Sequence, residues 1–332
     1  MASPRELGVE FTDPDLEESI ARGLDEVEDL MRASVKSDYP FVTETSRHLV
    51  EAGGKRFRPL VVLLSAYFGD PGAPGIIPAA VVVELTHLAT LYHDDVMDEA
   101  TLRRGATSAN TRWGNTVAIL TGDFLFARAS DMLADLGPRA VRIQARTFER
   151  LVHGQIRESV GPEPGVDPVE HYLRVLSDKT GSLIGTCARF GSMLAGADEP
   201  TVERLSRFGE RIGVAFQLAD DLLDVAAEAG QSGKTPGTDL REGVHTLPVL
   251  LALRSAAPGD ARLRELLTGD LSGDHRRAEA LAGLRVHPAL GEARRIAVGW
   301  AEEASQALQP LPDVPAKAAL QSVCRAIVDR NR

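Results

Sequence analysis

The chain has 332 residues, a hydrophobic fraction of 43% and a formal net charge of −11. The acidic total argues against a nucleic-acid partner, because proteins that follow a phosphate backbone usually carry a basic surface. The two cysteines, Cys187 and Cys324, are too few and too far apart to predict a disulfide framework or a cysteine metal site.

The hydrophobic pattern predicts helices along almost the whole chain. After a polar segment at 1–14, which we expect to be flexible, apolar residues recur every three or four positions from Leu16 to Met31, as in a helix with one buried face. Similar patterns predict helices at 43–51, 59–68, 77–97, 115–136, 139–159, 168–196, 201–229, 247–256, 261–267, 275–284, 289–308 and 315–330. Because no strand pattern or linker interrupts them, we expect one all-α domain over 15–332.

The N-terminal sequence lacks the basic and apolar regions of a signal peptide. The apolar run at 76–85 contains Pro78 and Glu84 and falls short of the ~20 residues that cross a membrane. We therefore expect a cytoplasmic protein without a transmembrane segment.

An acidic cluster ends the apolar helix predicted at 77–97. It reads D-D-x-x-D, and residues four apart share one face of a helix, so Asp94 and Asp98 are expected to point together. Asp95 lies about 100° around the helix, where it can reach a more distant ion or a neighbouring cation.

The same D-D-x-x-D pattern occurs at Asp220, Asp221 and Asp224, again after an apolar run. Like charges one turn apart destabilise a helix, and more so in apolar surroundings. Divalent cations would remove that repulsion, and carboxylate oxygens suit Mg²⁺. A single such pattern could equally be a solvated acidic helix face, but two copies in the same context favour metal binding.

A diphosphate bound to Mg²⁺ still carries negative charge on its outer oxygens, which calls for fixed cations. Basic or hydroxyl-bearing residues lie beside the two clusters or at helix starts: Lys55, Arg58, His87, Arg103, Arg104, Lys179, Thr180 and Lys234. An isolated basic pair is usually solvated surface, and a lone histidine is usually part of a core. Their common placement near the aspartates favours diphosphate binding.

Together these residues resemble the motifs of the trans-isoprenyl diphosphate synthases. The matching segments are 53–59, 91–98, 103–105, 179–180, 216–224 and Lys234, and the resemblance extends from about residue 15 to the end. It implies a large helical bundle of the isoprenoid synthase type around a central cavity, in a homodimer. It also implies head-to-tail condensation of isopentenyl diphosphate with an allylic diphosphate.

The resemblance assigns roles to the individual residues. Three Mg²⁺ ions are expected on Asp94, Asp98 and Asp220, with help from Asp95, Asp221 and Asp224. The residues expected at the allylic diphosphate are Arg103, Lys179 and Lys234, with Thr180 and Gln217 nearby. The residues expected at isopentenyl diphosphate are Lys55, Arg58, His87 and Arg104.

The length of the product depends on the side chains that a growing prenyl chain would meet. Positions one turn before Asp94 are Ala89 and Thr90, and neither is a bulky aromatic that would stop elongation at C15 or C20. The pattern resembles long-chain synthases, so we expect a product longer than C25 for a quinone side chain. A tunnel floor is expected deeper, at Phe124, Phe126 or Met132. Small residues also occur in tight helix packing, which is the alternative interpretation.

Other functions remain as alternatives. A short-chain synthase making C15–C20 products would share every aspartate motif. A class I terpene cyclase usually has a different second metal motif and needs no site for a second diphosphate. A non-catalytic partner subunit tends to lose an aspartate motif, and a purely structural bundle has no use for two acidic clusters.

Overall fold

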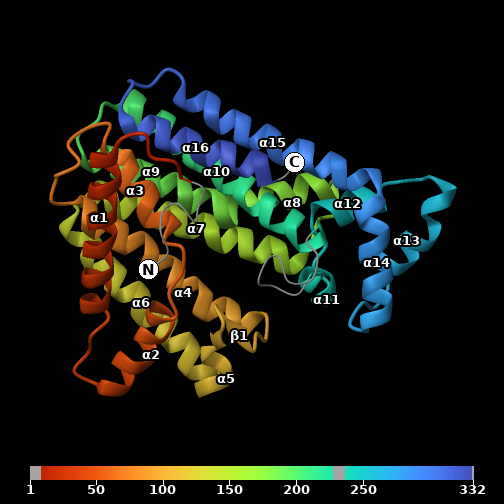
Figure 1. Ribbon diagram of the computed structural model, residues 1–332. Coiled ribbons are helices and arrows are strands. Elements are labelled where there is room, and N and C mark those ends of the chain that lie inside the picture. Colours follow the sequence, from red (N-terminus) through yellow and green to blue (C-terminus); the bar gives the residue numbers. More distant parts are fainter. Residues whose placement is uncertain (1–8, 227–235, 331–332) are drawn as a thin grey trace. The chain divides into compact units, whose positions relative to one another are not determined.

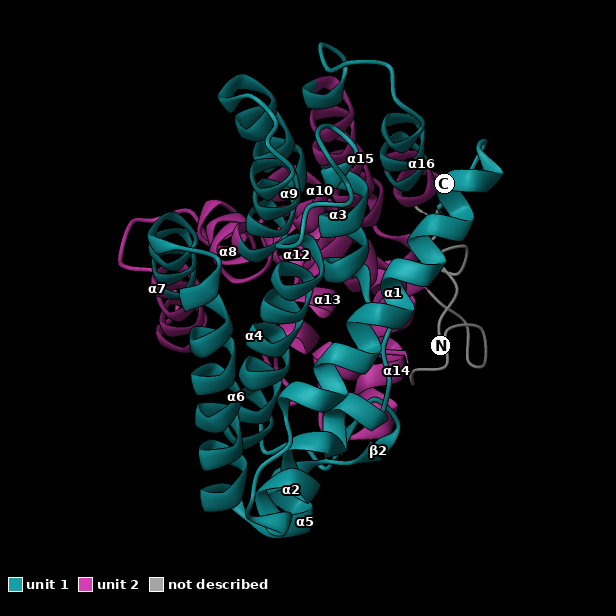
Figure 2. Ribbon diagram, turned by 90° about the vertical axis from the view of Figure 1, so that its left-hand side faces the viewer, with its two compact units in different colours: residues 1–148, 183–209, 307–323 teal, residues 149–182, 210–306, 324–332 magenta. Residues whose placement is uncertain are grey.

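The computed structural model describes residues 9–226 and 236–330, which Figure 1 shows as helices joined by loops. The all-α prediction is confirmed. The chain divides into two compact units, coloured separately in Figure 2: 1–148, 183–209 and 307–323 form one, and 149–182, 210–306 and 324–332 form the other. A single domain over 15–332 stays a prediction.

Helix α4, Ile76–Met97, is the centre of the first unit. It packs against three helices of the same unit: α1 (Pro14–Ser34), α3 (Phe57–Ala66) and α6 (Asn115–Asp135). Most of its residues from Ala79 to Tyr92 are buried, which explains why it is apolar on every side. Helices α2 (Pro40–Glu51) and α5 (Ala109–Trp113) also lie in this unit, and α7 (Pro138–Val160) begins in it.

Helix α4 is long and apolar enough to cross a membrane, although no transmembrane segment was predicted from the sequence. However, 67% of its apolar window is buried inside the structure, as in the core helix of a globular unit. Its composition is therefore explained by packing and does not indicate a membrane span.

The second unit has its own apolar core, which includes Leu218, Leu222, Leu247 and Leu284. The elements that begin in it are α8 (Pro168–Leu176), the π-turn η2 (Ser177–Gly181), α9 (Ser182–Leu194), α11 (Thr238–Arg241), α12 (Leu247–Leu253), η3 (Pro258–Asp260), α13 (Ala261–Leu267) and α14 (Asp274–Val286). Helices α10 (Glu199–Ala226), α15 (Pro288–Leu308) and α16 (Pro315–Arg330), like α7 and α9, have residues in both units.

The structure differs from the predicted elements in two ways. The helix expected at 168–196 is interrupted by η2, where the backbone takes one wider turn. The strands β1 (Leu102–Arg103) and β2 (Ala106–Thr107) form a small antiparallel hairpin that was not predicted. The short elements α5, α11 and η3 were not predicted either. All of these are too short to produce a periodic hydrophobic pattern.

Candidate active site

The first aspartate cluster lies where α4 ends. Asp98 is the C-cap residue, and Glu99 has a φ of 49°, the left-handed conformation that commonly stops a helix. Asp94 is partly exposed and the Asp98 side chain is 52% exposed, whereas Asp95 is fully buried. The two aspartates that were expected to share a face are thus the accessible ones.

The unpredicted hairpin returns the chain to this cluster. Arg104 and Gly105 both have positive φ, as a two-residue hairpin turn requires. The turn places Arg103 Nε 2.6 Å from Asp95 Oδ1 and its guanidinium 3.9 Å from Asp98 Oδ2. Burial raises the pKa of Asp95, although Arg103 opposes this shift. Within the described residues, the other oxygen of Asp95 has no hydrogen-bond partner.

The second cluster lies near the end of α10. Asp221 is buried, and it accepts hydrogen bonds from the Tyr172 hydroxyl and, over 3.0 Å, from Gln217 Nε2. Burial raises the pKa of Asp221 to about 6, and the two hydrogen bonds limit the rise. Asp220 is partly exposed. Asp221 is therefore held by protein groups in the way that Asp95 is held by Arg103.

Asp224 has a second contact that the sequence did not suggest. Its two carboxylate oxygens each accept a backbone N–H, from Thr238 and Asp239, over 3.1 Å. These are the first amides of α11, where a carboxylate is favoured by the orphan N–H groups of the helix start. Asp224 thus joins the end of α10 to the start of α11.

No group of three or more His, Cys, Asp or Glu side chains within the described ranges forms a ready-made metal cage. Mg²⁺ typically binds one or two carboxylates and completes its shell with water and substrate phosphate. Partly exposed carboxylates at Asp94, Asp98 and Asp220 fit that mode of binding. The chemistry of these donors therefore suits Mg²⁺ rather than a metal enclosed by protein ligands.

Two arginines at the start of α3 have different surroundings. Arg56 is buried and ion-paired with Glu28 and Glu84, the latter over 3.0 Å. Its charge is therefore compensated by these two carboxylates. Arg58 makes no hydrogen bond or ion pair with the described part of the chain, and its Nε is buried. Burial lowers the pKa of Arg58, and the charge of Glu84 opposes this. The Arg58 side chain is thus a partly desolvated cation with no hydrogen-bond or ion-pair partner among the described residues.

His87 and Arg104 lie in the same basic region. Burial, followed by the charges of Arg58 and Arg104, holds the pKa of His87 well below its ordinary value, so the imidazole is neutral. Arg104 donates to the carbonyls of Leu49, over 3.3 Å, and Gly53. Burial lowers the pKa of Arg104 as well. A neutral histidine beside several guanidinium groups leaves the region positively charged.

Lys179 and Thr180 lie within the π-turn η2. Such turns inside helices are frequent at functional sites because the extra residue redirects neighbouring side chains. Lys179 Nζ is 2.5 Å from Glu158 Oε2. Lys55 is exposed in the loop before α3. Lys234 lies outside the described residues, as do most of the residues of the loop around it.

The two residues expected to control chain length differ in exposure. Ala89 is fully buried, while Thr90 is partly exposed and its hydroxyl bonds the carbonyl of His87 over 2.8 Å. On α6, a Cβ at Gly122 would collide with the ring of His93, so α4 and α6 approach closely beside the first cluster. Phe126 packs against His93 at a centroid distance of 5.8 Å.

Comparison with known proteins agrees with these features. The polyprenyl synthetase family pattern matches residues 39–283. Nonaprenyl diphosphate synthase of Mycobacterium tuberculosis is 50% identical over 325 residues, 98% of this chain and 97% of that protein. The chain therefore belongs to the polyprenyl synthetase family.

Solved structures agree with this assignment. Geranylgeranyl pyrophosphate synthase from Corynebacterium glutamicum, in complex with calcium and isoprenyl diphosphate, has a TM-score of 0.88 at 45% identity over 97% of this chain and 99% of that chain. Decaprenyl diphosphate synthase from Rhodobacter capsulatus has a TM-score of 0.87 at 34% identity over 96% and 99%. The fold is therefore that of the isoprenyl diphosphate synthases.

Proposed function

We propose that the protein is a Mg²⁺-dependent trans-polyprenyl diphosphate synthase that condenses isopentenyl diphosphate with an allylic diphosphate. The observation that carries this proposal is the pair of aspartate clusters at helix ends, each with accessible outer carboxylates and a buried, protein-bound middle one. Family membership supports it. A cyclase or a structural bundle would have no need for the second set of cations around Arg58.

When bound, Mg²⁺ would supply positive charge beside the allylic diphosphate and so favour the loss of pyrophosphate. We assign up to three ions to Asp94, Asp98 and Asp220. Because Asp95 and Asp221 are occupied by Arg103 and by Tyr172 with Gln217, we assign them the role of supporting their clusters.

The chain's own cations hold the two substrates. Lys179, with Thr180 and Gln217 nearby, is assigned to the allylic diphosphate, as are Arg103 and Lys234. Arg58, Lys55, Arg104 and neutral His87 are assigned to isopentenyl diphosphate. The C–O bond of the allylic substrate breaks, the isopentenyl double bond attacks the freed carbon, and the departing pyrophosphate takes up the proton that is lost. Apolar helix faces keep water from the cation.

We propose a long all-trans product, of more than 25 carbons, for a quinone side chain. The nonaprenyl synthase at 50% identity supports this length, and so do the small side chains of Ala89 and Thr90. The geranylgeranyl synthase at 45% identity keeps a C20 product as the second candidate. Product length therefore has to be measured directly.

We also propose a cytoplasmic homodimer. Large apolar side chains are exposed on the first unit, including Ile119 (42%) and Leu120 (60%) of α6, which suit burial against a second copy. Light scattering of the purified protein tests this, and a monomeric active enzyme would contradict it.

The function is tested by incubating purified protein with labelled isopentenyl diphosphate, Mg²⁺ and allylic diphosphates of C5 to C20. We expect labelled products longer than C25 and none without Mg²⁺. Asp98→Asn and Asp220→Asn should each lower kcat by about a hundredfold or more. The matched control Asp25→Asn changes an exposed aspartate on α1 and should behave as the wild type. No incorporation by the wild-type protein would favour the partner-subunit alternative.

A further inference from the structure

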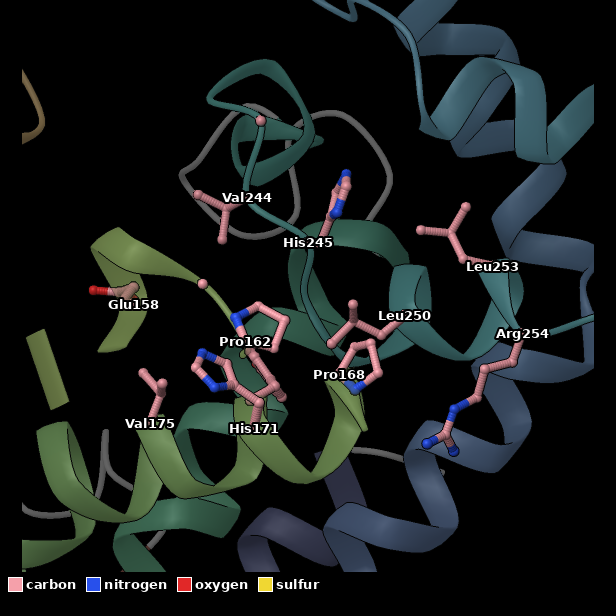
Figure 3. Close-up of a pocket in the computed structure, with 13 residues that line it drawn as sticks. Glu158, Pro162, Pro168, His171, Val175, Val244, His245, Leu250, Leu253 and Arg254 are labelled. Carbon is pink, nitrogen blue, oxygen red and sulfur yellow. The ribbon is translucent and has the colours of Figure 1, made fainter. Parts of the chain in front are cut away.

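A pocket of about 560 Å³ lies in the second unit, beside α8 and α12 (Figure 3). The segments that connect α7 to α8 and α11 to α12 complete its wall. Its volume falls within the roughly 300–1,000 Å³ typical of small-molecule sites. None of the motifs assigned to the two diphosphates contributes a lining residue.

The wall of this pocket is mainly apolar. Figure 3 shows the rings of Pro162 and Pro168 gathered near Leu250, with Val175 and Val244 on other sides. Val244 is 41% exposed, so part of this surface is open to a ligand. Burial of such a surface against a hydrocarbon is favourable because it removes apolar area from water.

The polar side chains that line the pocket are already engaged elsewhere in the second unit. Three of them pair with other side chains: Glu158 with Lys179, Arg254 with Asp167 and Tyr172 with Asp221. Figure 3 shows Glu158 and Arg254 at opposite sides of the view. In this structure, these pairings compensate the charges of Glu158 and Arg254.

The two histidines of the wall are also engaged. His171 Nε2 lies 3.1 Å from the carbonyl of Arg157, and His245 Nε2 lies 3.2 Å from the carbonyl of Leu267. Each ring therefore has only Nδ1 left for a ligand. Among the described residues of the wall, the pocket can therefore offer one or two imidazole nitrogens, and its one arginine, Arg254, is already paired.

We propose that this pocket binds an uncharged isoprenoid, a hydrocarbon chain with at most one hydroxyl, such as a prenyl alcohol. That the ligand is apolar and neutral follows from the wall; that it is an isoprenoid rests on the proposed function. A prenyl diphosphate fits this wall poorly, because the described wall residues include no unpaired lysine or arginine to compensate its desolvated charges.

The probe is radiolabelled farnesol, measured by equilibrium dialysis with the full-length protein. Mg²⁺ and saturating farnesyl diphosphate are present, and isopentenyl diphosphate is omitted, so that the allylic substrate site is filled and no product forms. We expect saturable binding of one farnesol per chain that farnesyl diphosphate does not displace. Absence of saturable binding, or displacement by farnesyl diphosphate, would overturn the proposal.

A matched pair of variants locates the binding. Val244→Asp places a charge in the pocket wall and should weaken farnesol binding by about tenfold or more, while the condensation rate stays unchanged. Val286→Asp adds the same charge at a position that is 86% exposed and outside the pocket, and should bind farnesol as the wild type does. Equal binding by both variants would refute this location. Failure of the proposed function is a separate outcome. It would appear as absence of condensation activity in an assay that contains no farnesol.

Discussion

The hydroxyl of Tyr172 donates a hydrogen bond to the buried carboxylate of Asp221, the middle residue of the second aspartate cluster. Arg103 has the corresponding position at the first cluster, where it donates to buried Asp95 over 2.6 Å. In both clusters a protein donor thus engages the middle carboxylate. The outer aspartates are left more accessible to ions and substrate.

Tyr172→Phe tests this arrangement by removing one donor from Asp221. A buried carboxylate that loses a hydrogen bond should cost about 1–3 kcal/mol of stability. We also expect a higher Mg²⁺ concentration for half-maximal activity, because the end of α10 would be held less firmly. Thermal unfolding and Mg²⁺ titration of the rate measure the two effects.

The matched control for this variant is Tyr67→Phe. The Tyr67 hydroxyl makes no hydrogen bond within the described residues, so its removal should change neither quantity. Equal behaviour of the two variants would show that the hydrogen bond to Asp221 contributes nothing.

Arg56 and Arg58 should give opposite phenotypes although they are two residues apart. Arg56→Gln removes the cation that buried Glu28 and Glu84 share, which leaves Glu28 with Arg32 at 3.2 Å and Glu84 with Arg104 at 3.8 Å, and should destabilise the fold by about 3 kcal/mol. Urea unfolding followed by circular dichroism measures this loss. A stability equal to that of the wild type would contradict a structural role for Arg56.

Arg58→Gln breaks no ion pair within the described residues, so the protein should remain folded. If Arg58 holds isopentenyl diphosphate, the KM for this substrate should rise by about tenfold or more. The KM for the allylic substrate should change little. Steady-state kinetics with each substrate varied in turn would contradict the assignment if both KM values rose together.

The sequence was sufficient to predict the long helices and to place both aspartate clusters near helix ends, because long periodic patterns determine those helices. It could not distinguish the roles of Arg56 and Arg58. Both lie in one basic run, and they differ in the structure because Arg56, whose φ is 51°, pairs with Glu28 and Glu84, which are both 28 residues away in the sequence. A backbone conformation of this kind leaves no signal in the hydrophobic pattern.

The partner of Asp221 was missed for another reason. Tyr172 precedes it by 49 residues and lies on a different helix, so only the tertiary structure brings the two together. Arg103 reaches Asp95 through a hairpin with strands of two residues, which is too short to be predicted from alternation. The sequence therefore predicted two aspartate clusters near helix ends, and missed Tyr172 and the hairpin that bring donors to the buried middle residues.

His87 should make the protein sensitive to acid. Its pKa lies well below the ordinary value of 6.5 in the folded state, so below pH 6.5 the unfolded chain binds more protons than the folded one. Stability contributed by the neutral imidazole is thus complete above that pH and lost as the pH falls. His87→Asn should reduce the stability lost between pH 7 and 5 by about 1–2 kcal/mol.

Urea unfolding at both pH values measures this difference. The control His275→Asn changes an exposed histidine on α14 and should lose as much stability on acidification as the wild type. Identical losses in all three proteins would contradict a neutral, desolvated His87.

Thr90, rather than Ala89, is the position at which a larger side chain should shorten the product. Ala89 is fully buried, so phenylalanine there would overpack the first unit and cost roughly 1–3 kcal/mol. Thr90 is partly exposed, and its hydroxyl bonds only the carbonyl of His87 in its own helix. Thr90→Phe can therefore extend its ring from α4 with little repacking. We expect a folded enzyme whose products, separated by reverse-phase thin-layer chromatography, are shorter than those of the wild type. Unchanged product length with Thr90→Phe would show that the growing chain does not pass this face of α4.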